Sequence, residues 1–241
     1  MRFGEVMETY QFEDLFEYGI IWSNRKTLTI AIEVGGKVVV KAPSFLTKKE
    51  IEYYLVKKRG WILNHLPQMV ALEEKKNIRK YEAGEKFLFR GVEYLLEIRS
   101  DVSYTTPVVK LLPGKLHISG KQLTPDEIQN ALKEWYVKQA VQIVQRRVGF
   151  YAPLLNVVPN KINLRDTKSR WGSCSSRGNI MINWRVIMAP PEILDYVVVH
   201  ELCHLKEMNH SRKFWKLVET IIPDWKGCRE WLRNNGISLS I

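Results

Sequence analysis

The segment that most constrains the fold is an apolar run near the C-terminus that contains two histidines and a glutamate. Residues 193–205 read ILDYVVVHELCHL, apolar nearly all round, which predicts a buried helix starting at Pro191. His200 and His204 are four residues apart and therefore share one helix face, from which both rings can bind one ion. The alternative is that hydrogen bonds satisfy both histidines in a core. We favour the ion, because burying them with Glu201 is costly without strong partners.

A third metal ligand is predicted a short distance beyond this helix. His210 lies at the position of the last histidine in the pattern H-E-x-x-H-x-x-G-x-x-H. Glu207 occupies the glycine position of that pattern, so we expect the chain to turn at Asn209, which tolerates left-handed geometry. A carboxylate from the following helix, Glu219 or Glu230, is the alternative third ligand. The sequence favours His210.

The residue types also predict the chemistry of the site. Neutral imidazoles leave Zn²⁺ a strong Lewis acid, which lowers the pKa of its water to about 7. Glu201 is one step round the helix, where it can hold that water and accept its proton. Cys203 is interpreted as a small buried hydrophobe rather than a ligand. His65 and His117 are isolated in the sequence and are interpreted as structural or surface residues.

Composition and cysteine usage restrict the class of protein. The 241 residues are 45% hydrophobic and 26% charged, as expected for a folded globular chain. Three cysteines without a C-x-x-C pair argue against a disulfide framework and favour a reducing compartment. The N-terminus is acidic where a signal peptide needs an apolar run, and no apolar stretch is long enough to span a bilayer. We expect a soluble cytoplasmic protein without membrane contact.

The charge balance points to anionic partners. The formal net charge is +11, and the segment 161–185 contains a single acidic residue, Asp166. This segment is either a solvated surface or a face that binds nucleic acid or nucleotides, and composition alone does not decide between them. Its basic residues are Lys161, Arg165, Lys168, Arg170, Arg177 and Arg185.

The pattern along the chain predicts an α+β fold. Three hairpins are expected in the first half, from TLTIAIE with KVVVKA, KFLF with VEYLLEI, and VVKLL with KLHIS. Capping boxes at Thr47 and Thr124 each begin a helix. KINLR, RWGSC and NIMINWRVI supply a small later sheet. We therefore predict a β-rich N-terminal part with one helix, residues 1–120, and an α-rich part, residues 121–241. No internal repeat is apparent.

Several motifs in residues 170–215 resemble the YgjP-like family of metal-dependent hydrolases. They are RWGSC before a strand, NWR after it, the proline-started helix with HELCH, and the tail NHSRKFW. These proteins are zinc metallopeptidase-like and are related to the SprT-like and WLM proteases. The resemblance implies that His200, His204 and His210 bind zinc and that Glu201 is the catalytic base.

The resemblance also implies a fold and a substrate. Residues 121–241 would form a zincin-like domain, in which an edge strand from NIMINWRV or RWGSC pairs with an extended peptide. Arg170 and Arg185 are candidates for substrate contact, with Arg170 also a candidate for oxyanion stabilisation, whereas Trp171 and Trp184 are interpreted as core residues. The implied activity is zinc-dependent peptide hydrolysis, with DNA-associated proteins as one substrate class.

Two other functions stay open on the sequence. One is a metal-dependent nucleoside-triphosphate pyrophosphatase, although the chain has neither a phosphate-binding glycine loop nor an acidic cluster for Mg²⁺. The other is a nucleic-acid-associated binding module with a structural zinc, which the presence of Glu201 beside the histidines makes the weaker alternative.

Overall fold

The computed structural model describes residues 8–33, 35–74, 79–167 and 170–241. The chain divides into two compact units, Met1–Ile78 and Arg79–Ile241. Each combines α-helix with small β-sheet, which confirms the α+β class. This division differs from the predicted boundary near Lys121. The reason is that residues 79–120 share one hydrophobic core with the rest of the second unit, for example Phe87 and Leu116 with Leu132. No helix in the described ranges is long and apolar enough to cross a membrane.

The first unit is a four-stranded sheet followed by one helix. Its strands are β1 (Glu8–Phe12), β2 (Phe16–Ser23), β3 (Thr29–Ile32) and β4 (Val38–Pro43), in the order β1-β2-β4-β3. The two inner strands β2 and β4 are parallel, and the outer pairings are antiparallel. Helix α1 (Lys48–Glu74) begins at the predicted capping box, where the Thr47 backbone N–H donates to Glu50 over 2.7 Å. The predicted β3–β4 hairpin is confirmed.

The second unit opens with a sheet of the same topology. Strands β5 (Lys86–Phe89), β6 (Val92–Ser100), β7 (Val108–Leu112) and β8 (Lys115–Gly120) have the order β5-β6-β8-β7, again with a parallel inner pair. Helix α2 (Pro125–Leu154) follows and begins at the Thr124 capping box. LTKKEI before and into α1 matches LTPDEI before and into α2. The chain therefore contains a structural repeat of four strands and a helix, which corrects the expectation of no internal repeat.

The remaining elements form the part of the second unit that contains the predicted site. Strands β9 (Lys161–Arg165), β10 (Gly172–Cys174) and β11 (Asn179–Asn183) make a sheet in the order β10-β11-β9, and the 3₁₀ turn η1 (Trp184–Met188) follows. The predicted strand NIMINWRVI is thus too long. It ends at Asn183, whose side chain accepts the Arg185 backbone N–H over 3.1 Å and so begins the 3₁₀ turn. Helices α3 (Pro191–Cys203), α4 (Arg212–Ile221) and α5 (Trp225–Asn235) and the turn η2 (Gly236–Ser238) complete the unit.

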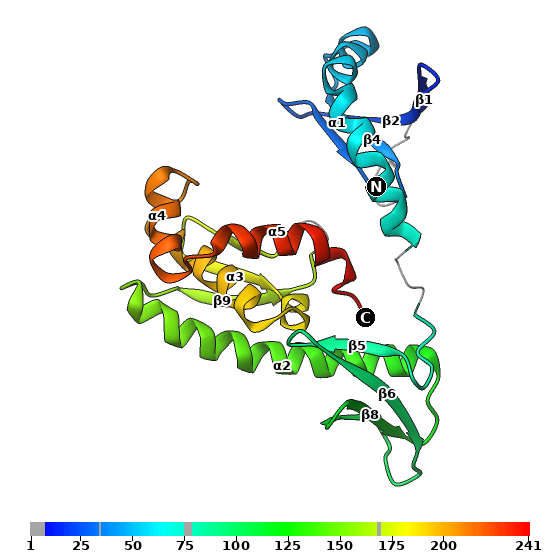
Figure 1. Ribbon diagram of the computed structural model, residues 1–241, viewed down its shortest axis with the longest axis vertical. Helices are drawn as coiled ribbons and strands as arrows, with labels where there is room; N and C mark the ends of the chain where they lie inside the picture. Colours follow the sequence, from blue (N-terminus) through cyan, green and yellow to red (C-terminus); the bar gives the residue numbers. More distant parts are fainter. Residues whose placement is uncertain (1–7, 34, 75–78, 168–169) are drawn as a thin grey trace. The chain divides into compact units, whose positions relative to one another are not determined.

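Helix α2 is the support on which α3 is placed. The two helices are in contact, and Figure 1 shows α2 running beside both α3 and β9. A partly buried ion pair joins Arg147 of α2 to Asp195 of α3, and Arg147 also donates to the Tyr151 hydroxyl over 2.9 Å. The buried ring of Tyr136, on the same helix, lies 6.2 Å from that of Trp184. Helix α2 thus contacts both α3 and the 3₁₀ turn that precedes it, and the last turn of α3 carries the site.

Candidate metal centre

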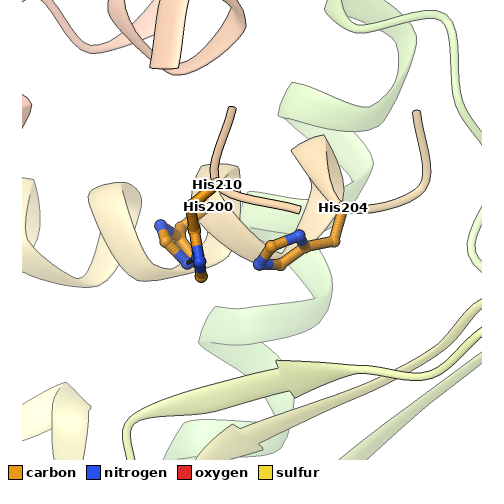
Figure 2. Close-up of side chains that lie close together, drawn as sticks. All are labelled: His200, His204 and His210. Atoms are coloured by element: carbon orange, nitrogen blue, oxygen red, sulfur yellow. Dashed lines mark hydrogen bonds between the residues drawn. The ribbon is translucent and has the colours of Figure 1, made fainter. Parts of the chain in front are cut away.

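Three histidine side chains converge at the end of α3. His200 lies in the last turn of the helix, and His204 is its C-cap residue. His210 comes from the segment that follows, immediately before Ser211, whose hydroxyl accepts the Phe214 N–H over 3.3 Å and caps α4. One ring nitrogen from each histidine lies within 4.8 Å of the others, and Figure 2 shows the three rings meeting. The helix end and the cap of the next helix together bring these rings to one point.

The turn between His204 and His210 is made without a left-handed residue. Among the described residues neither Glu207 nor Asn209 has a positive φ, so the expectation that Asn209 turns the chain in this way is wrong. Instead, α3 ends at Cys203, and the backbone N–H groups of Lys206 and Glu207 both donate to the Cys203 carbonyl over 3.0 Å. The glycine of the related pattern is unnecessary here, because these turn hydrogen bonds to the end of the helix redirect the chain.

The ring orientations suit metal binding. The Nδ1 of His204 lies 3.1 Å from the Glu207 carbonyl oxygen, which leaves its Nε2 free for a ligand. The Nε2 atoms of His200 and His210 are 3.0 Å apart. Two nitrogens bound about 2.0 Å from one tetrahedral ion lie about 3.3 Å apart, so a small adjustment admits the ion. Three neutral nitrogen donors at this spacing are the ligands that Zn²⁺ and similar divalent ions prefer.

Burial favours the unprotonated form of two of the donors, His200 and His204. It lowers the pKa of His200 to about 3, with further contributions from the neighbouring histidines and Arg229, and it lowers the pKa of His204 below its usual value. The Nδ1 of His200 is buried without a hydrogen-bond partner among the described residues. Protonated imidazoles cannot ligate, so these shifts favour the metal-binding form.

The alternative ligands lie elsewhere. Glu219 is exposed on α4, and Glu230 pairs with Arg233 over 2.9 Å; neither belongs to the cluster that the described residues form. Cys203 is fully buried, and burial raises the pKa of its thiol to about 12, which agrees with its interpretation as a hydrophobe. Of the third ligands considered from the sequence, His210 is the one that the structure places beside His200 and His204.

Glu201 lies beside the histidines in a closely fitted position. The residue is 4% exposed, and its Oε2 has no hydrogen-bond partner among the described residues. Burial raises its pKa to about 8, while the positive charge of Arg170 acts to lower it. The carboxylate packs directly on Gly172 of β10: a Cβ added there would lie 2.6 Å from the Glu201 Cγ. The glycine of RWGSC therefore makes room for this carboxylate, a role that the sequence alone did not indicate.

A pocket of about 310 Å³ opens at His200 and Glu201. Trp171 was predicted to be a core residue, but it is only half-buried and forms part of the pocket wall. Trp184 is buried as predicted. Two arginines of α5, Arg229 and Arg233, also line the pocket. Sequence reasoning missed both. Their spacing predicts a shared helix face, but nothing in the sequence indicates that this face meets α3.

The two arginines predicted to contact substrate do not line this pocket. Arg170 is exposed, and its backbone carbonyl accepts the Thr167 hydroxyl over 2.6 Å. Its charge acts on Glu201, so it lies near the site. Arg185 makes a two-pronged ion pair with Asp166, at 2.8 and 3.0 Å. Its guanidinium is thus already occupied within the protein.

The basic residues of segment 161–185 that the structure describes are spread along the small sheet and its turns. Strand β9 pairs in parallel with β11, which puts Lys161 beside Asn179 and Arg165 beside Asn183. The two basic residues of β9 are therefore at opposite ends of the strand, about 13 Å apart. Arg177 lies in the turn before β11, at the Lys161 end, and Lys168 lies outside the described residues.

The other two histidines have local roles, as expected. His117 of β8 is part of a polar chain on the sheet, with Nδ1 2.9 Å from Glu97 and Nε2 2.7 Å from the Ser119 hydroxyl. The His65 Nδ1 lies 2.8 Å from the Trp61 carbonyl on its own helix. Neither lies in the cluster of possible metal ligands among the described residues.

A family model described as YgjP-like, metallopeptidase domain, matches residues 26–235. The chain belongs to the YgjP-like family. One solved structure with similarity is that of the metallopeptidase zymogen of Pyrococcus abyssi abylysin, 26% identical, covering 37% of this chain and 93% of that chain, with a TM-score of 0.35. No curated protein matches.

Family membership sets the class of reaction. This YgjP-like chain is a metal-dependent hydrolase of the peptidase class, with peptides or proteins as its substrates. The matched residues, 26–235, extend through the second unit and into the first, so both repeats fall largely within the family domain.

Proposed function

We propose that the chain is a zinc-dependent metallopeptidase in which His200, His204 and His210 hold the ion and Glu201 is the catalytic base. The observation that carries the proposal is the convergence of three histidine nitrogens within 4.8 Å, with His200 and Glu201 lining one pocket. Three protein ligands fit a catalytic zinc, which keeps a coordination position open, whereas structural zinc sites use four.

The residues divide the reaction between them. A zinc ion held by the three histidines would supply Lewis-acid chemistry, which polarises a carbonyl and lowers the pKa of water. Glu201 takes a proton from the attacking water and returns it to the leaving nitrogen of the peptide. Gly172 keeps the carboxylate in place, because a larger residue would occupy its position. Arg170 is proposed to stabilise the carbonyl oxygen of the substrate, on which negative charge develops during attack. The basis is that the positive charge of Arg170 acts to lower the pKa of Glu201, so the two side chains are near each other.

The substrate is proposed to bind as an extended strand. Strand β10 is at the edge of the sheet β10-β11-β9, it contains Gly172, and it contacts α3. An edge strand leaves backbone N–H and C=O groups available for a further strand, and an added peptide would pass beside the histidines. This arrangement supports a zincin-like second unit. Arg185 is assigned to ordering the segment around Asp166.

The test is peptide hydrolysis by Glu201→Gln. We expect zinc-loaded wild type to cleave an unfolded protein substrate, and Glu201→Gln to lose activity by a factor of about 10² to 10⁴ while retaining zinc. Metal analysis of the same samples shows whether activity is lost because the catalytic base is missing or because the zinc ion is missing. A zinc-loaded wild type that cuts no protein, or a variant with full activity, contradicts the proposal. Nucleotides assayed in parallel test the pyrophosphatase alternative.

Gly172→Ala tests the placement of Glu201 independently. The added Cβ would lie 2.6 Å from the Glu201 Cγ, so the carboxylate must move. We expect activity to fall about a hundredfold with zinc content unchanged, because a misplaced base costs rate without removing ligands. Gly149→Ala is the matched control, since a Cβ there meets nothing within 4 Å. Equal activity of both variants would show that Glu201 needs no such fit.

DNA-associated proteins are retained as a proposed substrate class with its own assay. The separation of Lys161 from Arg165 and the pairing of Arg185 reduce the support for a continuous DNA face. The cleavage assay is therefore run with and without duplex DNA at two salt concentrations. Stimulation by DNA that disappears at the higher salt would support this substrate class, because phosphate contacts depend steeply on salt.

A further inference from the structure

The pocket beside His200 and Glu201 has a basic wall. Arg229 and Arg233 of α5 are four residues apart, on one face of the helix, and both line the pocket. The same two arginines line a second hollow of about 720 Å³, together with Trp225, Lys226 and Glu230. The two hollows therefore adjoin along α5, and positive charge continues from the site outward along the helix.

This positive charge is largely uncompensated. Among the described residues Arg229 has no ion-pair partner, and its guanidinium lies 5.8 Å from the ring centre of Trp215. Among the described residues, two acids line the two hollows. Glu201 belongs to the site itself, and Glu230 pairs with Arg233 where both side chains are well exposed, a weak interaction. Trp215 stacks on Trp225 with ring centres 4.0 Å apart, which gives Arg229 a rigid surface. A cation held over an aromatic ring keeps its hydrogen-bond donors free for a ligand.

We infer that Arg229, assisted by Arg233, binds a carboxylate of the substrate and makes the enzyme prefer acidic peptides. The inference rests on the proposed peptidase function and adds the chemical class of substrate to it. The arginine guanidinium presents paired N–H donors that match the two oxygens of a carboxylate. The pocket also contains Trp171, Val197 and Leu232, which suit the apolar stem of a glutamate side chain.

A peptide can supply this carboxylate in two ways. One is an Asp or Glu side chain near the scissile bond, and the other is the free carboxylate at the end of the chain. Both have the same recognition chemistry at Arg229. The first source gives an endopeptidase with a preference for acidic sequence, and the second gives removal of short C-terminal fragments.

The experiment uses the zinc-loaded full chain and one peptide series. The series carries Glu, Ala or Lys at one position near the cleaved bond, each with an amidated C-terminus, and the Ala peptide is also made with a free carboxylate. The proteins are wild type, Arg229→Gln, Arg233→Gln, the double variant and Arg146→Gln. Arg146 is an exposed arginine of α2 that donates to its own helix, so it is a matched control for loss of charge.

We expect wild type to cleave one carboxylate-bearing peptide at least about tenfold more efficiently, in kcat/KM, than the amidated Ala peptide. Arg229→Gln should abolish most of this preference, and Arg233→Gln should reduce it less, because Arg233 is already paired with Glu230. On the amidated Ala peptide Arg146→Gln should match wild type, and the variants of Arg229 and Arg233 should lose far less activity than they lose on the carboxylate-bearing peptide. Which of the two carboxylate peptides is preferred identifies the source.

Three results would overturn the inference. They are a wild type without preference, a double variant that keeps the preference, and a double variant that loses activity on every peptide alike. If wild type cleaves no peptide, the proposed function fails, and the inference is then tested by peptide binding instead of cleavage. Calorimetry with Glu201→Gln should then still show tighter binding of a carboxylate-bearing peptide, lost on adding Arg229→Gln. Equal binding of charged and neutral peptides would overturn it.

Discussion

The two repeats of four strands and a helix have the same topology but different surroundings. Each helix begins at a threonine–glutamate capping box, and Leu55 of α1 and Leu132 of α2 both follow the capping threonine by eight residues and are fully buried. Twelve residues after the threonine the repeats diverge. In α1 this residue is Arg59, about half-exposed and paired with Glu13, whereas in α2 it is the fully buried Tyr136.

This difference shows what turns the second repeat into a platform for the site. Helix α1 buries one face against its own sheet and exposes Tyr53, Tyr54 and Trp61. Helix α2 buries residues along most of its length, because it packs on its sheet and also on η1 and α3. The shared topology supplies the support, and the residues added after the second repeat supply the chemistry. A set of matched substitutions tests this division.

The largest difference is expected between Tyr136→Ala and Arg59→Ala. Removing the Tyr136 ring empties a packed site and removes its hydrogen bond to the Leu88 carbonyl, which should lower the free energy of unfolding of the second unit by about 3–5 kcal/mol. Arg59→Ala removes an exposed ion pair and should change the free energy of unfolding of the first unit by less than about 0.5 kcal/mol. Urea unfolding followed by hydrogen exchange for each unit measures both. Similar losses would mean that the two helices are equally packed.

Leu132→Ala and Leu55→Ala should destabilise the protein by similar amounts, but each should affect only its own unit. Each deletes a fully buried leucine from its own core, at a cost of about 2–5 kcal/mol. Because the two units have separate cores, only Leu132→Ala should lower retention of the proposed zinc ion on heating. Hydrogen exchange and zinc content as a function of temperature provide the comparison. Zinc loss in Leu55→Ala would show that the site depends on the first repeat.

The capping boxes give the smallest effect. Thr124→Ala and Thr47→Ala each remove a hydroxyl that caps its helix, and each should cost about 0.5–2 kcal/mol in its own unit. The stability of the other unit should stay unchanged in each variant. Hydrogen exchange in the first turn of α1 and α2 reports the local fraying. Protection lost in both units from one substitution would contradict the independence of the two cores.

The sequence was sufficient where local chemistry decides the structure. The capping boxes at Thr47 and Thr124, the hairpins and the proline-started helix that contains His200 all depend on neighbouring residues, and the structure contains each of them. Local chemistry was insufficient where distant segments meet. The repeat is defined by strand order and by few shared residues, so it was not apparent.

The site itself divides in the same way. The spacing of the three histidines predicted a shared centre, and the structure brings their rings together. The fit of Gly172 against Glu201 and the approach of Arg229 to the pocket depend on how β10 and α5 pack on α3. Packing between elements is not encoded in spacing along the chain. The turn after α3 was predicted incorrectly because a helix end can unwind without the left-handed residue that the related pattern uses.

Metal content of three proteins tests the central proposal most directly: wild type, His210→Ala and His65→Ala, the last a histidine of the first repeat. Elemental analysis after exhaustive dialysis in zinc-containing and then zinc-free buffer gives the stoichiometry. The account predicts about one equivalent of zinc in wild type and in His65→Ala, and loss of most of it in His210→Ala, which removes one of three ligands. Full zinc content in His210→Ala, or none in wild type, would contradict it.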